Sequence, residues 1–320
     1  MKLPVLKIAD LVAKIPIIQG GMAVRISGAE LAAAVAEEGG IGVIAGTGLT
    51  AEEIRSEIKK ARSKTDGIIG INVMFAVQDF AKLVMAAIEE KIDLVISGAG
   101  FSRDMFTWGK KYNVPIVPIV SSAKLARLAQ KLGAAALIIE GKEAGGHLGT
   151  ERSVKDILPE VRAVVEIPIV AAGGVMNGQD IVEMLKLGAN GVQMGTRFAA
   201  SKESGASEAF KQLLVNSSLE DVTLIESPVG LPGRALNSPL VEKLKTGNNK
   251  PDKCNNCLKK CSHRFCILTA LSDAQVGNFE NGLFFSGERV DEIKDIPSVK
   301  EIFTRLLHDV EDIAGKEVLA

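Results

Sequence analysis

The 320-residue sequence lacks the long apolar segments of membrane proteins and of secreted precursors. It contains no uninterrupted run of about 18 apolar residues, so we expect no membrane-spanning helix. Residues 1–21 have no continuous apolar core followed by a small-residue cleavage site, so they do not resemble a signal peptide. These absences favour a cytoplasmic protein.

An excess of charge of one sign is also missing. The formal net charge is −1, and no run of Lys and Arg reaches the density of a nucleic-acid-binding groove. We therefore expect a small-molecule substrate and no nucleic-acid or membrane partner, and the sequence leaves a homodimer open. Apolar residues make up 47% of the chain, so a chain of this length can bury a large core without disulfides.

A repeated unit organises the first two-thirds of the chain. Nearly continuous apolar runs, which are typical of parallel strands buried on both faces, alternate with amphipathic helical patterns. Strands are predicted at residues 15–19, 41–46, 68–73, 93–97, 115–120, 136–140, 167–172 and 191–194. Helices are predicted between them at residues 28–38, 51–61, 80–91, 124–132, 154–165 and 179–187.

Eight such units match the closure of an α/β fold, the (β/α)8 TIM barrel. An open doubly wound sheet is the alternative, and the absence of a G-x-G-x-x-G fingerprint after the first strand weakens it. We predict a barrel over residues 1–200, a cap over residues 201–287 and a C-terminal helix within residues 288–320 that packs back on the barrel. Within the cap we expect a helix at residues 202–216 and a Pro/Gly loop at residues 227–238.

Glycine follows nearly every predicted strand. Barrel enzymes place their active sites on the loops after the carboxyl ends of the strands, where glycine lets the backbone approach a ligand closely. A tight turn explains any one of these glycines, but their recurrence favours a flat ligand across the barrel mouth. The glycines lie at positions 20, 21, 46, 48, 98, 100, 141, 145, 146, 149, 173, 174 and 195.

The seventh and eighth units carry the most specific pattern. Gly173 and Gly174 end the seventh strand before a helix that opens near Gly178, and Gly195 and Thr196 follow the eighth strand. Free backbone amides and the positive end of a helix attract a phosphate dianion, and these two loops form the phosphate site frequent in this fold. The sequence therefore predicts a phosphate-bearing cofactor or substrate here.

His147 is the candidate proton-transfer residue. It is one of three histidines and the one that follows a barrel strand, in the glycine-rich stretch of residues 141–149. An imidazole titrates near neutral pH, which suits proton transfer, although a lone histidine is more often structural or exposed. Glu140 and Glu143 flank the same loop, where they could orient His147 or contact a ligand hydroxyl.

All four cysteines fall within one short stretch, CNNCLKKCSHRFC: Cys254, Cys257, Cys261 and Cys266. In a cytosolic protein such a cluster indicates metal or iron–sulfur ligation rather than disulfides. Thiolates favour zinc or an iron–sulfur cluster, and the spacing does not decide between them. Free thiols or a redox pair are the alternative.

Five segments in this order and with barrel spacing carry a family resemblance: IPIIQGGM, GINVMF, EGKEAGGHLG, IPIVAAGGVMNG and GVQMGTRF. Together they resemble the nitronate monooxygenase family, the former 2-nitropropane dioxygenases, which includes FMN-dependent enoyl-acyl-carrier-protein reductases. The resemblance covers residues 15–204. It implies an FMN-dependent oxidoreductase with the flavin at the barrel mouth.

The resemblance also implies roles for individual residues. His147 is the family's catalytic residue near the flavin, used as a base or a proton donor. The segment Gly20–Gly21–Met22 lies against the isoalloxazine, and Asn72 contacts its polar edge. The full set of expected cofactor contacts is Gly20, Gly21, Met22, Asn72, Glu140, Gly145, Gly146, Gly173, Gly174, Gln193, Met194, Gly195 and Thr196.

The cysteine stretch departs from the family pattern, and its start is similar to the cluster-binding stretch of dienoyl-coenzyme-A reductases. The leading hypothesis is oxidation of alkyl nitronates, with His147 as the base or positioning group. The alternative is an NAD(P)H-dependent reductase of an enoyl thioester or a quinone. A third hypothesis is a redox sensor whose cysteine segment reports to a partner.

Overall fold

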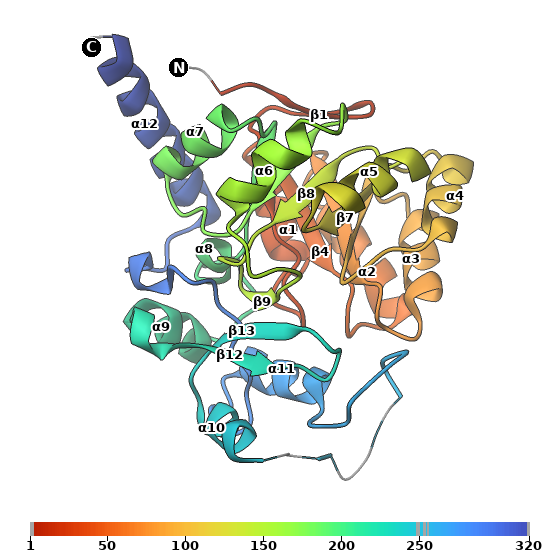
Figure 1. The fold of residues 1–320 in the computed structure, drawn as a ribbon, viewed down its shortest axis with the longest axis vertical. Helices are drawn as coiled ribbons and strands as arrows, with labels where there is room; N and C mark the ends of the chain where they lie inside the picture. The colour runs from red at the N-terminus through yellow and green to blue at the C-terminus, as the bar shows by residue number, and fades with distance from the viewer. Residues whose placement is uncertain (1–2, 248–249, 252–253, 255, 319–320) are drawn as a thin grey trace.

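Eight short runs of buried residues form the parallel strands of a closed barrel in the computed structural model (Figure 1). The barrel closes because its last strand pairs with its first, with Val192 opposite Ile17. The predicted TIM barrel is therefore confirmed, and the open doubly wound sheet is wrong. In chain order the strands are β3 (Ile17–Gln19), β4 (Ile41–Ala45), β5 (Ile68–Met74), β6 (Leu94–Gly98), β7 (Ile116–Val120), β8 (Leu137–Glu140), β10 (Ile169–Ala172) and β11 (Gly191–Met194).

Amphipathic helices surround the barrel and cover the outer side chains of its strands. In the second helix, for example, Ile54 and Ile58 are buried one turn apart, while acidic and basic residues occupy the other face. The helices are α1 (Ala29–Glu37), α2 (Ala51–Arg62), α3 (Phe80–Glu89), α4 (Arg103–Tyr112), α5 (Ala123–Leu132), α6 (Val154–Arg162) and α7 (Gly178–Lys186). The sequence pattern predicts each of them except α4.

The end of the barrel where the strands begin is closed by an N-terminal hairpin, β1 (Leu6–Ile8) and β2 (Leu11–Ala13). Leu6 and Ile8 are fully buried and pack with Ile18 inside the barrel, beside the start of β11. The structure describes residues 3–247, 250–251, 254 and 256–318. None of the helices in these residues has the length and apolar character needed to cross a bilayer.

A smaller α/β cap lies over the other end, at the carboxyl ends of the strands (Figure 1). Its antiparallel sheet joins a hairpin of the cap to a short strand from the barrel's own loop, with Gly233 opposite His147. The elements of this region are β9 (Gly146–His147), α8 (Thr196–Ala199), α9 (Glu208–Asn216), β12 (Val222–Glu226), β13 (Pro232–Leu236), α10 (Pro239–Thr246) and α11 (Ile267–Val276), with 3-10 turns at Leu219–Asp221 and Val290–Glu292. The Pro/Gly loop predicted at residues 227–238 is therefore wrong in part, because β13 finds its pairing partners outside that stretch.

The last helix, α12 (Val299–Val318), packs against α7 and α1 on the outside of the barrel. Its buried Phe303 and Leu306 join the main apolar cluster. Asp309 accepts a hydrogen bond at Oδ2 from the backbone amide of Gly178 at 3.2 Å, so this helix is tied to the start of α7. The domain boundaries at residues 200 and 287 remain predictions.

Candidate active site

Two adjoining cavities lie at the carboxyl ends of the barrel strands. The first, of about 200 Å³, is mainly apolar and is walled by Ile267, Leu268 and Leu271 of α11; we call it the apolar lobe. The second, of about 130 Å³, follows the loops after β10 and β11; we call it the glycine lobe. Asn72 and Glu140 line both lobes, so the two form one bent site.

Every residue predicted to contact the cofactor lines one lobe or both, and His147 lines the apolar lobe. The apolar lobe is lined by Gly21, Met22, Asn72, Glu140, Gly145, Gly146, His147 and Thr196 from that set. The glycine lobe is lined by Gly20, Gly21, Met22, Asn72, Glu140, Gly145, Gly173, Gly174, Gln193, Met194 and Gly195. Cys254, Cys257, Cys261 and Cys266 line neither lobe among the described residues.

The bent site offers hydrogen-bond donors that have no partner among the described residues, at Gly174 and Gly195 in the glycine lobe and at Thr196 in the apolar lobe. The backbone amides of Gly174, Gly195 and Thr196 donate no hydrogen bond to another described residue. Thr196 Oγ1 accepts from the amide of Gly287 at 2.9 Å, which leaves its own hydroxyl hydrogen free to donate. Gln193 Oε1 is buried and has no partner in the described part of the chain. Buried polar atoms are normally paired, so this set suits a polar ligand that spans the two lobes.

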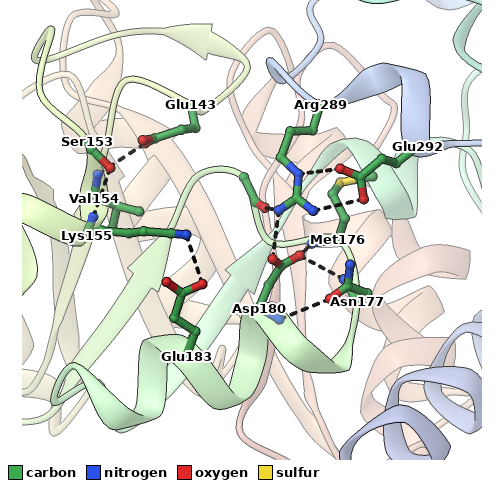
Figure 2. A network of polar contacts seen from close by, with 11 residues as sticks. Glu143, Ser153, Val154, Lys155, Met176, Asn177, Asp180, Glu183, Arg289 and Glu292 are labelled. Atoms are coloured by element: carbon green, nitrogen blue, oxygen red, sulfur yellow. Dashed lines mark hydrogen bonds and ion pairs between the residues drawn. The ribbon is translucent and has the colours of Figure 1, made fainter.

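The N-terminus of α7 does not serve as the predicted anion site, because carboxylates already occupy it (Figure 2). Asp180 Oδ2 accepts from the amides of Met176 (2.8 Å) and Asn177 (3.2 Å), and an aspartate of α12 accepts from Gly178. Arg289 bridges the same Asp180, at 2.8 Å, to the carbonyl oxygen of Gly174. The phosphate prediction therefore rests on the loop amides and not on this helix.

Two buried side chains, Gln19 and Ser27, hold the loop of residues 20–22 in place by hydrogen bonds. Sequence reasoning did not identify either of them. Gln19 donates to Ser27 Oγ at 2.8 Å and accepts from a backbone amide of β4, while Ser27 Oγ accepts from the amide of Met22 at 2.9 Å. Ser27 also donates to the carbonyl oxygen of Gly20 at 3.0 Å. This network fixes the loop after β3, whose Gly21 and Met22 line both lobes.

Glu140 ends β8 with its carboxyl group at the junction of the two lobes. Burial raises the pKa of Glu140 to about 8, because desolvation disfavours the charged carboxylate. The group is therefore a neutral carboxylic acid at pH 7 and can donate a hydrogen bond to a ligand. A neutral acid at this position also adds no negative charge at the junction of the lobes.

His147 lies on β9, where strand pairing with β13 fixes its backbone. Its ring packs edge-on against Phe285, with centroids 5.2 Å apart, and its Nε2 lies 2.7 Å from Ser227 Oγ. Burial lowers the pKa of His147 to about 4, since the imidazolium is poorly solvated there. The imidazole is therefore neutral at pH 7, the state that a general base requires.

Three parts of this site were missed by sequence reasoning: Ser227, Phe285 and the wall formed by α11. They lie 80 or more residues after His147. None of them follows a barrel strand, so a search of the loops after the strands does not identify them. A possible indication was the polar Ser227 at the start of the Pro/Gly stretch. Its partner could not be read from the sequence.

The four cysteines are free thiols, and three of their sulfurs accept hydrogen bonds. The donors are the amides of Asn256 and His263 and the hydroxyl of Thr269. Burial and then the neighbouring Cys266, Cys261 and Cys254 raise the pKa of the Cys257 thiol. No three His, Cys, Asp or Glu side chains of the described residues are gathered closely enough to hold a metal ion. The metal prediction is therefore not confirmed.

Comparison with known proteins gives one family and several relatives of nearly full length. The family model of nitronate monooxygenase matches residues 6–309. The solved structure of FabK from Thermotoga maritima is 34% identical, with a TM-score of 0.86 over 94% of each chain. A (3aS,4S,5R,7aS)-5-hydroxy-7a-methyl-1-oxo-octahydro-1H-indene-4-carboxyl-CoA dehydrogenase of Rhodococcus jostii is 29% identical over 92% of each chain. A probable nitronate monooxygenase of Staphylococcus aureus is 29% identical over 72% of this chain and 77% of its own.

Proposed function

The chain belongs to the nitronate monooxygenase family and is an oxidoreductase, and from this premise we propose that it is an FMN-dependent enzyme that oxidises alkyl nitronates with His147 as its base or positioning group. The observation that carries the proposal is the bent site itself. It joins a lobe of unpartnered backbone donors to an apolar lobe that holds a neutral imidazole.

The residues present fit FMN. The amides of Gly174, Gly195 and Thr196 would hold the phosphate, and Gln193 would pair its buried amide group with the polar part of the cofactor. The loop of residues 20–22 and Asn72 would line the ring, because they lie where the two lobes meet. A bound FMN supplies the electron-transfer chemistry that no side chain of the protein can provide.

Within this site His147 has a defined task. A neutral imidazole can accept the α-proton of a neutral nitroalkane, and it can hold an anionic nitronate by a hydrogen bond. The apolar walls from α11 and Phe285 exclude water from the alkyl side of such a substrate. Glu140 remains neutral and so adds no negative charge beside the anion.

The test is anaerobic mixing of the pure enzyme with a nitronate, with NADH and with NADPH in separate experiments, followed by flavin absorbance. Bleaching by the nitronate, and oxygen-dependent consumption of nitronate in air, would support the proposal. If neither occurs, nitronate oxidation is rejected. Rapid bleaching by a nicotinamide alone would instead assign the second candidate.

The second candidate is an NAD(P)H-dependent reductase of an enoyl thioester or quinone. One observation favours it: FabK and a carboxyl-CoA dehydrogenase are among the proteins that match more than nine-tenths of the chain. The apolar lobe, with Leu268 and Leu271 in its wall, also suits an acyl chain. In that reaction His147 would lie near the carbon that receives a proton.

The pH dependence of kcat/KM should have two limbs. Activity should rise through about pH 4, where His147 loses its proton, and fall above about pH 8, where Glu140 becomes an anion beside the ligand. An ordinary histidine would place the acid limb near pH 6.5. We expect Glu140→Gln to remove the alkaline limb, and Glu151→Gln on the exposed neighbouring loop to leave it unchanged. An unaltered alkaline limb in the Glu140 variant would assign it to another group.

For the cysteine segment we propose a thiolate-ligated zinc ion or iron–sulfur cluster. Four cysteines within 13 residues, and hydrogen bonds to three of the sulfurs, support it, because such bonds stabilise thiolate ligands. Elemental analysis of the pure protein should find stoichiometric zinc or iron, which Cys257→Ser should lower. A visible spectrum after flavin removal separates a cluster from zinc. Protein without either metal would leave four free thiols.

A further inference from the structure

The hydroxyl group of Ser227 connects the catalytic candidate to the opposite side of the cap. Ser227 is 5% exposed and lies in the tight turn between β12 and β13, where its amide donates to the carbonyl oxygen of Leu231 at 3.1 Å. It does not line the apolar lobe but borders a separate open cavity on the outer face of this turn. His147 lines the apolar lobe, so the bond between the two side chains crosses from one cavity to the other.

This contact decides which nitrogen of His147 is available for chemistry. Nε2 is engaged by Ser227 Oγ at 2.7 Å, and Nδ1 has no hydrogen-bond partner among the described residues. A neutral imidazole carries one proton, so one ring nitrogen donates and the other accepts. If Nε2 donates to Ser227, the lone pair of Nδ1 is left for the substrate; if Ser227 donates, that lone pair is lost.

The surroundings of Ser227 favour the first arrangement. The amide of Val229 points at Ser227 Oγ, at 3.5 Å, and leaves the oxygen one lone pair and its own hydrogen. Ser227 borders the outer cavity together with Ser262 and Arg264, so its hydroxyl hydrogen can point toward solvent there. The remaining lone pair then faces Nε2–H, as expected when a hydroxyl accepts from a neighbour and donates to water.

The geometry points to Ser227 as the positioning residue that holds His147 in its Nε2–H form, leaving Nδ1 as the proton-accepting atom. The inference rests on the proposed function of His147 and adds the residue that sets its tautomer. The backbone of His147 pairs with β13 and its ring bonds to the turn before β13, so a single hairpin of the cap fixes both. When the substrate is a neutral nitroalkane, its α-C–H bond breaks, the electron pair moves toward the nitro group to give the nitronate, and the proton moves to Nδ1.

The first measurement is ¹⁵N NMR of histidine-labelled holoenzyme at neutral pH, with the His147 signals assigned by their loss in His147→Ala. We expect protonated Nε2 and bare Nδ1 in the wild type, and a shift toward the Nδ1–H form or a mixture in Ser227→Ala. A wild-type enzyme with a proton on Nδ1 and none on Nε2 would overturn the inference. This result does not depend on turnover.

The second measurement is steady-state kinetics of the same variants with a neutral nitroalkane as substrate, because a nitronate has already lost its α-proton. Loss of the correct tautomer should lower kcat about tenfold or more with little change in KM, because Ser227 does not touch the substrate cavity. Ser227→Thr keeps a hydroxyl and should restore most of the rate. Ser262→Ala removes a hydroxyl from the same outer cavity without touching His147 and should behave as wild type.

Different outcomes reject the role of His147 and the role of Ser227. If His147→Ala retains full turnover, the proposed function of His147 is rejected, whatever the tautomer. If His147→Ala is inactive while Ser227→Ala keeps the wild-type spectrum and kcat, the positioning role is rejected and the base stands. A melting temperature of Ser227→Ala close to wild type would show that a lost rate reflects the tautomer and not unfolding.

Discussion

Replacing His147 with alanine should lower turnover about 100-fold or more while FMN stays bound. The magnitude follows from the usual contribution of a positioned acid or base, about 10²–10⁴ in rate. The ring lines the apolar lobe and not the glycine lobe, so its removal leaves the expected phosphate contacts untouched. Steady-state kinetics and the flavin-to-protein absorbance ratio measure the two effects separately.

His308→Ala is the matched control for this variant. His308 lies on the exposed side of α12, near Asp312 at 3.4 Å, and far along the chain from the lobes. We expect it to retain wild-type turnover. Full activity in the His147 variant would remove that residue from the mechanism, and a colourless His147 variant would place it in cofactor binding instead.

Gly195→Val should weaken the binding of FMN. A Cβ atom added at Gly195 meets only Met22 Sδ, at 3.8 Å, so it extends into the glycine lobe rather than into packed protein. A valine there would occupy the space expected for the phosphate and cover the neighbouring amides. Steric overlap of this kind costs about 1–3 kcal/mol, which corresponds to roughly tenfold to hundredfold weaker binding. FMN titration of the apoprotein, followed by fluorescence, measures it.

Gly195 makes a sharper test than Gly174, which is adjacent in the site. Gly174 has φ +70°, where any side chain is strained, and an added Cβ lies 3.2 Å from Glu143 and not in open space. A defect at Gly174 would therefore mix misfolding with lost binding. Gly247→Val, where no atom of a described residue beyond its chain neighbours lies within 4 Å of the added Cβ, is the control and should bind FMN normally. A yellow Gly195 variant with wild-type affinity would place the phosphate elsewhere.

Much of the barrel could be predicted because its determinants are local. Each strand is a short apolar run and each outer helix an amphipathic pattern, so both can be recognised within a few residues. The glycines after the strands mark the active-site end for the same reason, which is why the predicted contacts from Gly20 to Thr196 line a single bent site. The missed helix, α4, has the sequence RDMFTWGKKY, in which Gly109 and the polar residues obscure the pattern.

The cap and the details of the site could not be predicted, because they depend on partners distant in sequence. Strand β13 pairs with the barrel's β9, and the expected loop gave no indication of it. The start of α7 has the features of an anion site in the sequence. Asp309, 131 residues away, occupies one of its amides, and Arg289 covers Asp180.

By itself the sequence determined the barrel, the loops that would hold a phosphorylated flavin and the histidine beside them, because strand periodicity and glycine placement act over short distances. Only the tertiary structure decided what surrounds that histidine: the burial that keeps it neutral, the wall of α11, and a serine 80 residues away that engages one of its nitrogens. Burial and hydrogen bonding between distant segments arise when the cap folds over the barrel mouth, and no local pattern of residues encodes them.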